Sequence, residues 1–481
     1  MGSGSREVPA AQQRVSHRTE QEEDGHPGVR TADWRRPENR LNGYLARIPA
    51  LAWLAAGVAV FAVSVLVYQQ LVSANPILWG HTDEWVYRAA GEVVRQRPAD
   101  VYRVLLGEPG ATQLPFTYPP FAGLLFTLGT PFSFAVWQMV LVVVNIALLP
   151  VILFFSLRVS GHGGVTGAAL AFALAAMALW LEPVYMTLYF GQINLILLAL
   201  VIIDLALPDS CKWKGIGVGI AAGIKLTPLI FVPFLLGSRR VRAGLVALLT
   251  FAVTVVIGFA VLPAAARNFW TSNLDRPDYK LQNQSIDGFL ERLLPGHPAV
   301  HTLWLALAFA VALAGLALAV IASRRGLELL GIELTALTGL LISPISWTHH
   351  WVWAVVPGLA LMAAGARRRA TAAGDRAAVR PRDWIARAAG IAVILIVFGE
   401  WPKRTPVGHV SEWLPSGLLR FAPHGNGVEY SWHGGSLLLG NMYLIVAAVA
   451  MAGAAGYLWV TRRYDQNTAQ AGHGSEPLTK V

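Results

Sequence analysis

The chain has 481 residues, of which 55% are hydrophobic and 14% are charged, and its mean hydropathy is +0.50. These values exclude an ordinary soluble domain and predict an all-α polytopic membrane protein. The net charge of +10 is interpreted as a signal of membrane topology and not of nucleic-acid binding, because the position of Lys and Arg in loops orients membrane helices.

The two ends of the chain are predicted to be polar tails. Residues 1–48 have mixed charge and few aromatic side chains, a composition that cannot bury a core, so they predict a disordered cytoplasmic tail. The apolar segment that begins near Pro49 is long enough to cross a bilayer, and no cleavable signal peptide is recognised. Residues 461–481 predict a second cytoplasmic tail, which leaves 49–460 as the transmembrane domain.

The stretch ILWGHTDEWVYRAAGEVV lies in the loop after the first span, residues 73–133. From Thr82, the predicted N-cap, apolar residues recur at helical spacing and predict an amphipathic helix at the membrane surface. Two interpretations of its acidic pair, Asp83 and Glu84, stay open. The pair can simply favour the helix dipole, or a carboxylate above a membrane cavity can act as a general base toward a hydroxyl.

The apolar segments predict the membrane spans, each of which needs about 20 residues. The candidate spans are 49–72, 134–157, 165–181, 193–207, 215–237, 243–263, 300–323, 327–342, 349–366, 384–400 and 437–460. The positive-inside rule places the short basic loops CKWK, RRVR, RR, RRR with RPR, and TRR in the cytoplasm. Because CKWK and RRVR flank the same segment, 215–237, this segment is predicted to be two short helices that break before Pro228.

This arrangement predicts about twelve crossings with both termini in the cytoplasm. The outer side then carries the loops 73–133, 264–299 and 401–436, together with the breaks in YFGQIN, KLTP and SPISWTHH. The Pro-bounded segment 119–131 is too short to cross and is interpreted as a half-inserted outer helix. Irregular backbone at membrane depth is tolerated only beside protein or a water-filled cavity, so these breaks predict a cavity on the outer face.

Lys225 is the only charged residue in the apolar segment 215–237. A cation at the bilayer centre costs about 2.5 to 3.5 kcal/mol on insertion scales, so this residue needs a partner. One interpretation is that its ammonium snorkels to the outer surface. The other is that it binds an anionic group, most simply a lipid phosphate.

His349 and His350 begin a predicted span in SPISWTHHWVW, among three tryptophans. They are interpreted either as interfacial histidines of an aromatic belt or as ligands for phosphate or sugar hydroxyls. Adjacent side chains on a helix point about 100° apart, which argues against a shared zinc site. The single cysteine, Cys211, excludes a cysteine cage and an intramolecular disulfide, so no metal site is predicted.

Uncharged polar side chains lie at the predicted outer ends of other spans. YFGQIN contributes Gln192 and Asn194, NQSIDG contributes Asn283 and Gln284, and TYPPF contributes Tyr118. Amides and a phenol suit sugar hydroxyls, although helix capping explains each amide motif taken singly.

The intramembrane acids Asp204 and Glu328 lie near the predicted cytoplasmic ends of spans. They are interpreted as helix-packing partners and not as catalysts. No nucleotide-binding, dinucleotide-binding or hydrolase motif is recognised, so no cofactor is predicted.

The motifs HTDEWVY, PFTYPPFAGLLF, YFGQINLIL, GIAAGIKLTP, NQSIDGFLERL and LLISPISWTHHWVW, in this order, resemble a known family. It is the polyprenyl-phosphate-mannose-dependent α-(1→2)-mannosyltransferases of actinobacteria, glycosyltransferase family 87, and the resemblance spans about Leu51 to Val460. It implies a GT-C catalytic domain over 49–460 at the plasma membrane, with the active site on the outer face. It also implies a polyprenyl-phosphate-mannose donor and a mannosylated glycolipid acceptor, as in the synthesis of phosphatidylinositol mannosides, lipomannan and lipoarabinomannan.

The same resemblance implies roles for individual residues. Asp83 matches the family's catalytic aspartate, and His349 with His350 matches its active-site histidine motif. Since the donor is β-linked and the product is α-linked, transfer inverts the anomeric carbon, with Asp83 as the base toward the acceptor's 2-hydroxyl. Lys225 and one of the two histidines would stabilise the departing phosphate, and Glu84 keeps an ordinary helix-start role. The residues left to hold sugar hydroxyls are Tyr118, Gln192, Asn194, Asn283 and Gln284.

Two alternatives stay open at the level of sequence. An arabinofuranosyltransferase that uses polyprenyl-phosphate-arabinose would share the fold and differ in the sugar. A lipid-sugar transporter or flippase would also have broken helices and a charge in the membrane. It predicts internal sequence symmetry and polar residues on both faces, whereas the polar candidates of this chain gather on the predicted outer side.

Overall fold

The structure is a computed structural model that describes residues 37–74, 80–110, 113–271, 278–356, 381–400 and 417–473. It divides into two compact units, Met1–Pro49 and Ala50–Val481, and the account below concerns the second. Parts of several sequence predictions lie outside the described residues. They are most of the N-terminal tail, the end of the predicted span 349–366, most of the first half of the loop 401–436, and residues 474–481.

Among the described residues, five helices are long and apolar enough to cross a membrane, by length and composition. They are α1 (Pro37–Ala74), α4 (Phe134–Val159), α10 (Val241–Val261), α13 (Val300–Arg324) and α18 (Met442–His473). Large apolar side chains on α10 and α13, such as Leu249 and Phe309, are more than half exposed. Lipid accommodates such surfaces and water does not. The chain is therefore a mostly helical membrane protein, as its composition predicts.

The other predicted spans contain helices that are shorter or carry more charge. They are α5 (Gly164–Ala178), α7 (Asn194–Leu205), α8 (Ile216–Ile224), η4 (Thr227–Ile230), α9 (Phe231–Gly237), α14 (Glu328–Ile342), η5 (Thr348–Val355) and α16 (Pro381–Phe398). Two short helices were not predicted as spans: α6 (Glu182–Phe190) lies between the predicted spans 165–181 and 193–207, and α17 (Gly434–Gly440) lies at the start of 437–460. Helix length alone therefore accounts for five crossings. The total of about twelve stays a prediction.

The predicted break within residues 215–237 is confirmed. α8 ends at Ile224, and Lys225 has extended backbone, with φ −144° and ψ 128°. The 3-10 helix η4 then begins at Thr227, with Pro228 in its first turn. Proline has no N–H to continue the preceding helix and disfavours helical backbone just before it. Lys225 therefore lies on an irregular connection between two short helices.

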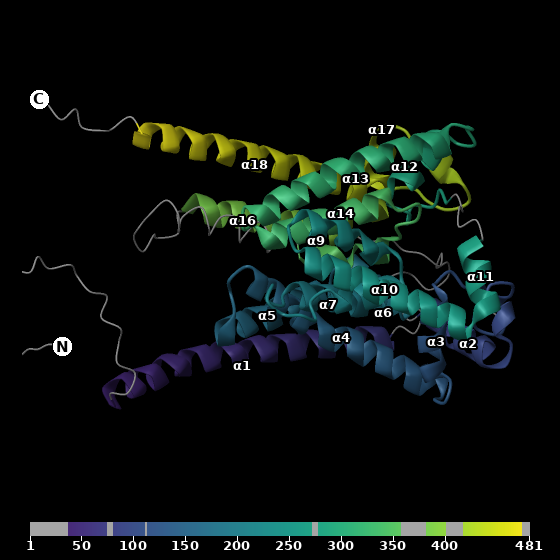
Figure 1. Ribbon diagram of the computed structural model, residues 1–481. Coiled ribbons are helices and arrows are strands. Elements are labelled where there is room, and N and C mark those ends of the chain that lie inside the picture. The colour runs from purple at the N-terminus through teal and green to yellow at the C-terminus, as the bar shows by residue number, and fades with distance from the viewer. Residues whose placement is uncertain are drawn as a thin grey trace, which may run out of the picture. The chain divides into compact units, whose positions relative to one another are not determined.

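The predicted outer loops contain most of the remaining elements. The loop 73–133 holds α2 (Thr82–Gln96), η2 (Pro98–Asp100), the antiparallel pair β1 (Leu105–Leu106) and β2 (Leu114–Pro115), α3 (Pro120–Phe126) and η3 (Thr127–Gly129). The later loops hold α11 (Pro263–Thr271), α12 (Ile286–Leu293), η6 (Gly417–Phe421) and η7 (Val428–Ser431). Figure 1 shows α2, α3 and α11 close together toward the right-hand end of the view, with α12 beside α13 above them.

α2 packs its apolar face on the protein. Val86, Ala90 and Val94 are buried, and a Cβ at Gly91 would lie 2.4 Å from the carbonyl oxygen of Phe126. The helix is amphipathic, as predicted, but its apolar stripe is covered by α3. The N-cap was predicted one residue too late, because His81 occupies that position, with φ 49°.

Basic and acidic residues from three loops meet at the ends of α7, α9 and α13. Arg240 forms ion pairs with Asp209 at 2.9 Å and with Glu328 at 2.8 Å, and Lys214 pairs with Asp209 at 2.8 Å. Asp204 accepts hydrogen bonds from the backbone N–H groups of Gly215 and Val218 at the start of α8. Asp204 and Glu328 thus tie helices together, as the sequence predicts.

Candidate active site

Asp83 lies in the first turn of α2 and faces the connection between α6 and α7. Its Oδ2 accepts a hydrogen bond of 2.7 Å from Nε2 of Gln192. The backbone of Gln192 is held in turn, because its N–H donates to Thr187 and its carbonyl accepts from the Asn145 amide at 3.0 Å. Asp83, half-buried, therefore has one carboxylate oxygen fixed by an amide that the surrounding helices hold in place.

Two tyrosines complete the surroundings of Gln192. Its Oε1 accepts from the hydroxyl of Tyr87 at 2.6 Å and from that of Tyr118 at 3.1 Å. The two hydroxyl oxygens are 2.7 Å apart. Tyr87 was not among the residues predicted for the site. The available signal is its spacing, because a residue four positions after Asp83 lies on the same face of a helix.

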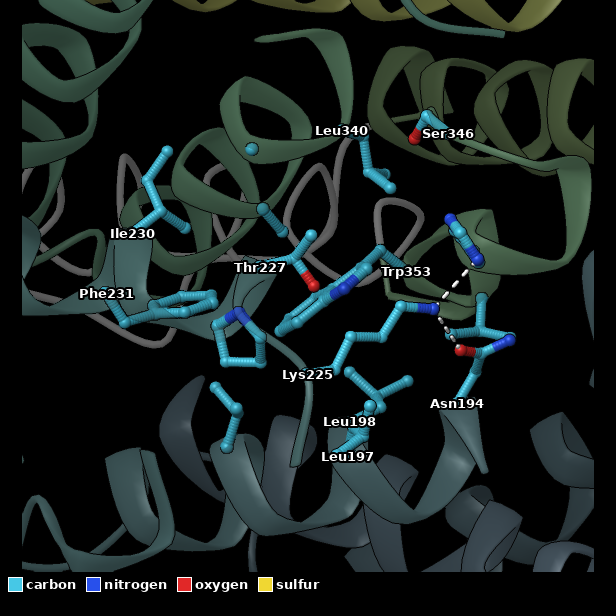
Figure 2. Close-up of a pocket in the computed structure, with 16 residues that line it drawn as sticks. Asn194, Leu197, Leu198, Lys225, Thr227, Ile230, Phe231, Leu340, Ser346 and Trp353 are labelled. Carbon is cyan, nitrogen blue, oxygen red and sulfur yellow. Dashed lines mark hydrogen bonds between the residues drawn. The ribbon is translucent and has the colours of Figure 1, made fainter. Parts of the chain in front are cut away.

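Lys225 extends from the break after α8 toward α7 and η5. Its Nζ donates to Oδ1 of Asn194 at 3.2 Å and lies 2.8 Å from Nε2 of His350. A charged ammonium can only donate, so this contact makes Nε2 the acceptor and leaves the ring proton on Nδ1. Lys225 also lies 5.8 Å from the ring centroid of Tyr118. Figure 2 shows the Lys225 side chain directed at Asn194, with the hydrogen bond drawn.

The side chains of His349 and His350 have different surroundings, although they are adjacent. The two rings are 4.8 Å apart with planes at 89°, and only His350 reaches Lys225 among the contacts of the described residues. The His349 ring is buried, 5.4 Å from the ring of Phe190, and neither of its nitrogens has a hydrogen-bond partner among the described residues. Its backbone carbonyl accepts from Thr187 at 3.2 Å and from Asn194 at 2.9 Å. This carbonyl ties η5 to α6 and α7.

A cavity of about 50 Å³ adjoins Lys225. Its polar lining includes Asn194, Lys225 and His350, and the rest is largely aliphatic or aromatic, contributed by α7, η4, α9, α14 and η5. Figure 2 shows Leu197, Leu198 and Trp353 beside the lysine stem, and Ile230, Phe231 and Leu340 farther along the pocket lining. The rings of Phe231 and Trp353 stack at 5.4 Å. The cavity therefore has a cationic polar end and an apolar body.

Asn283 and Gln284 do not join this group. The Asn283 amide donates to the carbonyls of Asp278 and Pro344 and accepts from the N–H of Ser346. The Gln284 amide donates to the carbonyls of Leu281 and Gly440 and accepts from the N–H of Tyr443. Both side chains are fully buried, and their donors and acceptors bind backbone. Asn283 holds the segment before α12 against the loop that leads into η5, and Gln284 holds it against the start of α18.

Glu84 departs from the solvated helix-start role expected of it. Its side chain is fully buried, with Oε2 3.0 Å from Nδ1 of His81. It packs on the glycine of YFGQIN, where a Cβ at Gly191 would lie 2.5 Å from Cβ of Glu84. Burial raises the pKa of Glu84 to about 8 and lowers the pKa of His81 to about 4. Both groups are therefore neutral between these values.

Three features of its surroundings set the pKa of Asp83. Burial raises its pKa, whereas the hydrogen bond from Gln192 and the charge of Lys225 lower it, and the result is a pKa of about 6. Asp83 is then mostly ionised at neutral pH and can accept a proton. Among the described residues, no three His, Cys, Asp or Glu side chains gather to hold a metal ion.

These observations define a helical membrane protein with a carboxylate, an ammonium and an apolar cavity at one place. The model of glycosyltransferase family 87 matches residues 116–344. This range includes Tyr118, Gln192, Asn194 and Lys225 and leaves out Asp83 and the two histidines of η5. No solved structure matches the chain significantly.

Curated relatives cover more of the chain. The polyprenol-phosphate-mannose-dependent alpha-(1-2)-phosphatidylinositol mannoside mannosyltransferase of Mycobacterium tuberculosis is 34% identical over 369 residues, which are 70% of this chain and 81% of the relative. The protein of the same name from Mycolicibacterium smegmatis is 33% identical over 350 residues, 67% and 78%. A phosphatidylinositol pentamannoside mannosyltransferase of M. tuberculosis is 36% identical over 270 residues, 53% and 60%.

The chain is thus a membrane enzyme of the glycosyltransferase class. The chain is a member of glycosyltransferase family 87. The resemblance expected from the sequence motifs is confirmed.

Proposed function

We propose that this enzyme transfers mannose from polyprenyl-phosphate-mannose to the 2-hydroxyl of a mannosylated glycolipid, with inversion, to form an α-(1→2) linkage. The acceptor class is that of phosphatidylinositol mannosides, lipomannan or lipoarabinomannan. The observation that carries the proposal is that Asp83 and Lys225 lie near the same two side chains: Gln192 binds Asp83 and the Tyr118 hydroxyl, and Lys225 lies 5.8 Å from the Tyr118 ring. The donor and the kind of acceptor are supported by the names of relatives that are 33–34% identical over two thirds or more of the chain.

Asp83 is the general base in this proposal. As the acceptor's 2-oxygen attacks the anomeric carbon, its proton moves to the carboxylate of Asp83. The bond from the anomeric carbon to the phosphate oxygen breaks on the opposite face, which inverts the configuration. The electron pair leaves with the polyprenyl phosphate, so no carboxylic acid is needed to protonate it.

Lys225 and His350 stabilise the departing phosphate. The ammonium of Lys225 is fixed by Asn194 and His350 at the polar end of the cavity. A preorganised cation at the site where negative charge grows lowers the barrier more than it strengthens ground-state binding. The apolar body of the cavity suits the first isoprene units of the donor. Of the two histidines, His350 is proposed because its ring, not that of His349, reaches Lys225.

Asn194 is proposed to hold Lys225 and not to bind the sugar, because its Oδ1 accepts from Lys225 and its Nδ2 donates to the backbone of η5. Asn283 and Gln284 are left out of the proposed substrate contacts, because backbone groups occupy their amides. Tyr118 binds Gln192, which in turn binds Asp83, so neither side chain is proposed as a contact to the sugar.

We further propose a GT-C topology for residues 49–460, with about twelve crossings, both termini in the cytoplasm and the site open to the outer face. The support is the position of the site relative to the basic loops. Asn194 begins α7 and Asp204 lies at its other end, and Lys225 follows α8, which Asp204 caps at its start. The site and the cluster around Arg240 thus lie at opposite ends of both helices.

The test uses radiolabelled polyprenyl-phosphate-mannose and membranes that contain the wild type or Asp83→Asn, which replaces the base by a neutral amide of equal size. We expect α-(1→2)-linked mannose in the glycolipid fraction from the wild type only. Transfer that survives the substitution would contradict the base. Incorporation from polyprenyl-phosphate-arabinose alone would contradict the sugar, and movement of intact donor across the membrane without transfer would favour a flippase.

A further inference from the structure

Gln192 lies between the proposed base and two phenols, and its surroundings fix which way its amide points. On one side Nε2 donates to Asp83 at 2.7 Å. On the other side Oε1 faces the hydroxyls of Tyr87 and Tyr118 at 2.6 and 3.1 Å. An ionised carboxylate only accepts hydrogen bonds, so the amide N–H must face Asp83, and a phenol can donate to the oxygen that remains.

The two phenol hydroxyls cannot form all three hydrogen bonds of this cluster at the same time. Three oxygen contacts join Tyr87, Tyr118 and Gln192, and the two phenols together have two hydrogens. Either both hydroxyls donate to Oε1, or one donates to the other, which then donates to Oε1. In each arrangement Oε1 accepts from at least one phenol, so a flipped amide would bring two acceptors together at Asp83 and leave the phenol side without its acceptor.

The phenols themselves are held rigidly. Tyr87 is fully buried and stacks on Phe126 with ring centroids 4.4 Å apart. The backbone carbonyl of Tyr118 accepts from the hydroxyl of Tyr102 at 2.7 Å. Since Gln192 is 4% exposed, water does not compete for its amide. The orientation of the Gln192 amide, and with it the hydrogen bond to Asp83, is therefore fixed by protein groups and not by water.

We infer that Gln192 is a positioning residue for Asp83, aligned by the Tyr87 and Tyr118 hydroxyls, and not a contact to the substrate sugar. It occupies Oδ2 of Asp83 and so directs Oδ1 toward the acceptor hydroxyl. It also keeps Asp83 ionised near neutral pH, because a donor to a carboxylate favours the charged form. This inference rests on the proposed role of Asp83 as base.

The decisive substitution is Gln192→Met, which keeps length and volume and removes both amide functions. We expect kcat for mannosyl transfer to fall about 10- to 100-fold, the loss typical of one hydrogen bond to a charged group. KM for donor and acceptor should change by less than about threefold, because no substrate contact is removed. The acidic limb of the kcat profile should move upward by about one pH unit, because the carboxylate loses a stabilising donor.

The phenols provide a graded test. Tyr87→Phe keeps the ring stacked on Phe126 and leaves Tyr118 to donate to Oε1, so a small shift of the limb is expected. The double variant Tyr87→Phe/Tyr118→Phe removes both donors and should approach Gln192→Met. Tyr279→Phe is the control, since it removes a phenol hydroxyl that lies outside this cluster, on a ring that packs against Tyr430. It should leave the limb in place.

A readout without substrate separates this inference from the proposed reaction. The infrared carboxyl stretch that disappears in Asp83→Asn is titrated in wild-type and Gln192→Met protein. A midpoint near pH 6 in the wild type and a higher one in the variant are expected. An unchanged midpoint and limb, or a KM increase as large as the loss of kcat, would overturn the positioning role while leaving the base intact. Full transfer by Asp83→Asn would instead overturn the proposed base.

Discussion

Two adjacent carboxylates of α2 have different surroundings. Consecutive residues on a helix point about 100° apart, so Asp83 meets Gln192 whereas Glu84 meets His81 and Gly191. Asp83 has a neighbouring cation, Lys225, and a donor, and both favour its ionised form. Glu84 faces His81, whose own pKa burial lowers to about 4, and burial raises the pKa of Glu84. One position is suited to accept a proton, and the other is suited to stay neutral inside the fold.

Glu84 should make stability depend on pH. Its pKa rises from 4.5 to about 8 on folding, so between these values the folded state binds a proton that the unfolded chain releases, and stability falls as pH rises. Glu84→Gln retains a donor for His81 and removes the titration. We expect it to stabilise the protein by about 1 to 3 kcal/mol at pH 8 and by little at pH 4.5. Thermal unfolding in detergent at both pH values measures this, and equal shifts would contradict it.

Lys225 should matter to transfer through its charge. Lys225→Gln keeps a polar side chain near Asn194 and His350 and loses the cation, so we expect the transfer rate to fall about 100- to 1000-fold. Lys212→Gln removes the same charge from an exposed position in the basic loop and serves as the control, with unchanged rate. The measurement is initial transfer from labelled donor by each variant. A loss of less than threefold in Lys225→Gln would count against its role at the phosphate.

At the scale of elements, the site depends on where helices stop. α6 ends at Phe190 and is capped by Gly191, which has φ 66°, and α7 begins at Asn194. This short connection places Gln192 beside Asp83 and Asn194 beside Lys225. The break after α8 supplies Lys225 in the same way. Three helix ends therefore contribute side chains that a continuous helix would direct along its sides.

Gly191→Ala tests the connection between α6 and α7. At this position alanine would have to adopt a left-handed backbone conformation. Its methyl group would also lie 2.5 Å from Cβ of Glu84. Gly161→Ala is the matched control, because Gly161 also has positive φ, 86°, with nothing within 4 Å of an added Cβ. We expect Gly191→Ala to lower the free energy of unfolding by about 1 to 3 kcal/mol more than the control. The rate of mannosyl transfer should also fall in Gly191→Ala, because Gln192 shifts. Thermal unfolding and a transfer assay measure the two effects. Equal effects of Gly191→Ala and Gly161→Ala would contradict the prediction.

At the scale of the whole molecule, α7 and α8 set the depth of the site. They have 12 and 9 residues, which correspond to about 18 and 14 Å, against about 30 Å for the hydrocarbon core of a bilayer. The cluster of Asp209, Arg240 and Glu328 lies at one end of this helix pair and Lys225 at the other. If that cluster lies at the cytoplasmic surface, the cavity is recessed below the outer surface, where a lipid phosphate could reach it from the side.

The single cysteine offers a direct test of orientation. Cys211 lies in the basic loop and is partly exposed, so we expect a membrane-impermeant thiol reagent to label it in inverted vesicles and not in intact cells. Glu108→Cys on a Cys211→Ser background places the only thiol at an exposed position of the loop 73–133 and should give the opposite pattern. Mass spectrometry of the labelled protein measures both. Labelling of Cys211 in intact cells would reverse the proposed topology.

Much of the organisation could be predicted because its causes are local. The length of the apolar segments indicates membrane helices, and the spacing of apolar residues indicates the amphipathic α2. Pro228 indicates the helix break at which Lys225 lies. The N-cap of α2 was misplaced because His81, in a left-handed conformation, takes the position expected for Thr82. The number of crossings was not tested by helix length, since broken and short helices carry no length signal of their own.

The residues of the site divide in the same way. By itself the sequence determined the class of protein, its family motifs, and the polar residue types that a lipid-linked sugar would need, since these follow from composition and spacing. Only the tertiary structure decided which of them meet. It directed the amides of Asn283 and Gln284 to backbone groups and buried Glu84. It also gave His349 and His350 different partners and placed Tyr87 against Gln192. The physical reason is that a side chain's partners come from helices far apart in the chain, and the hydrogen bonds it must satisfy on burial are set by their packing.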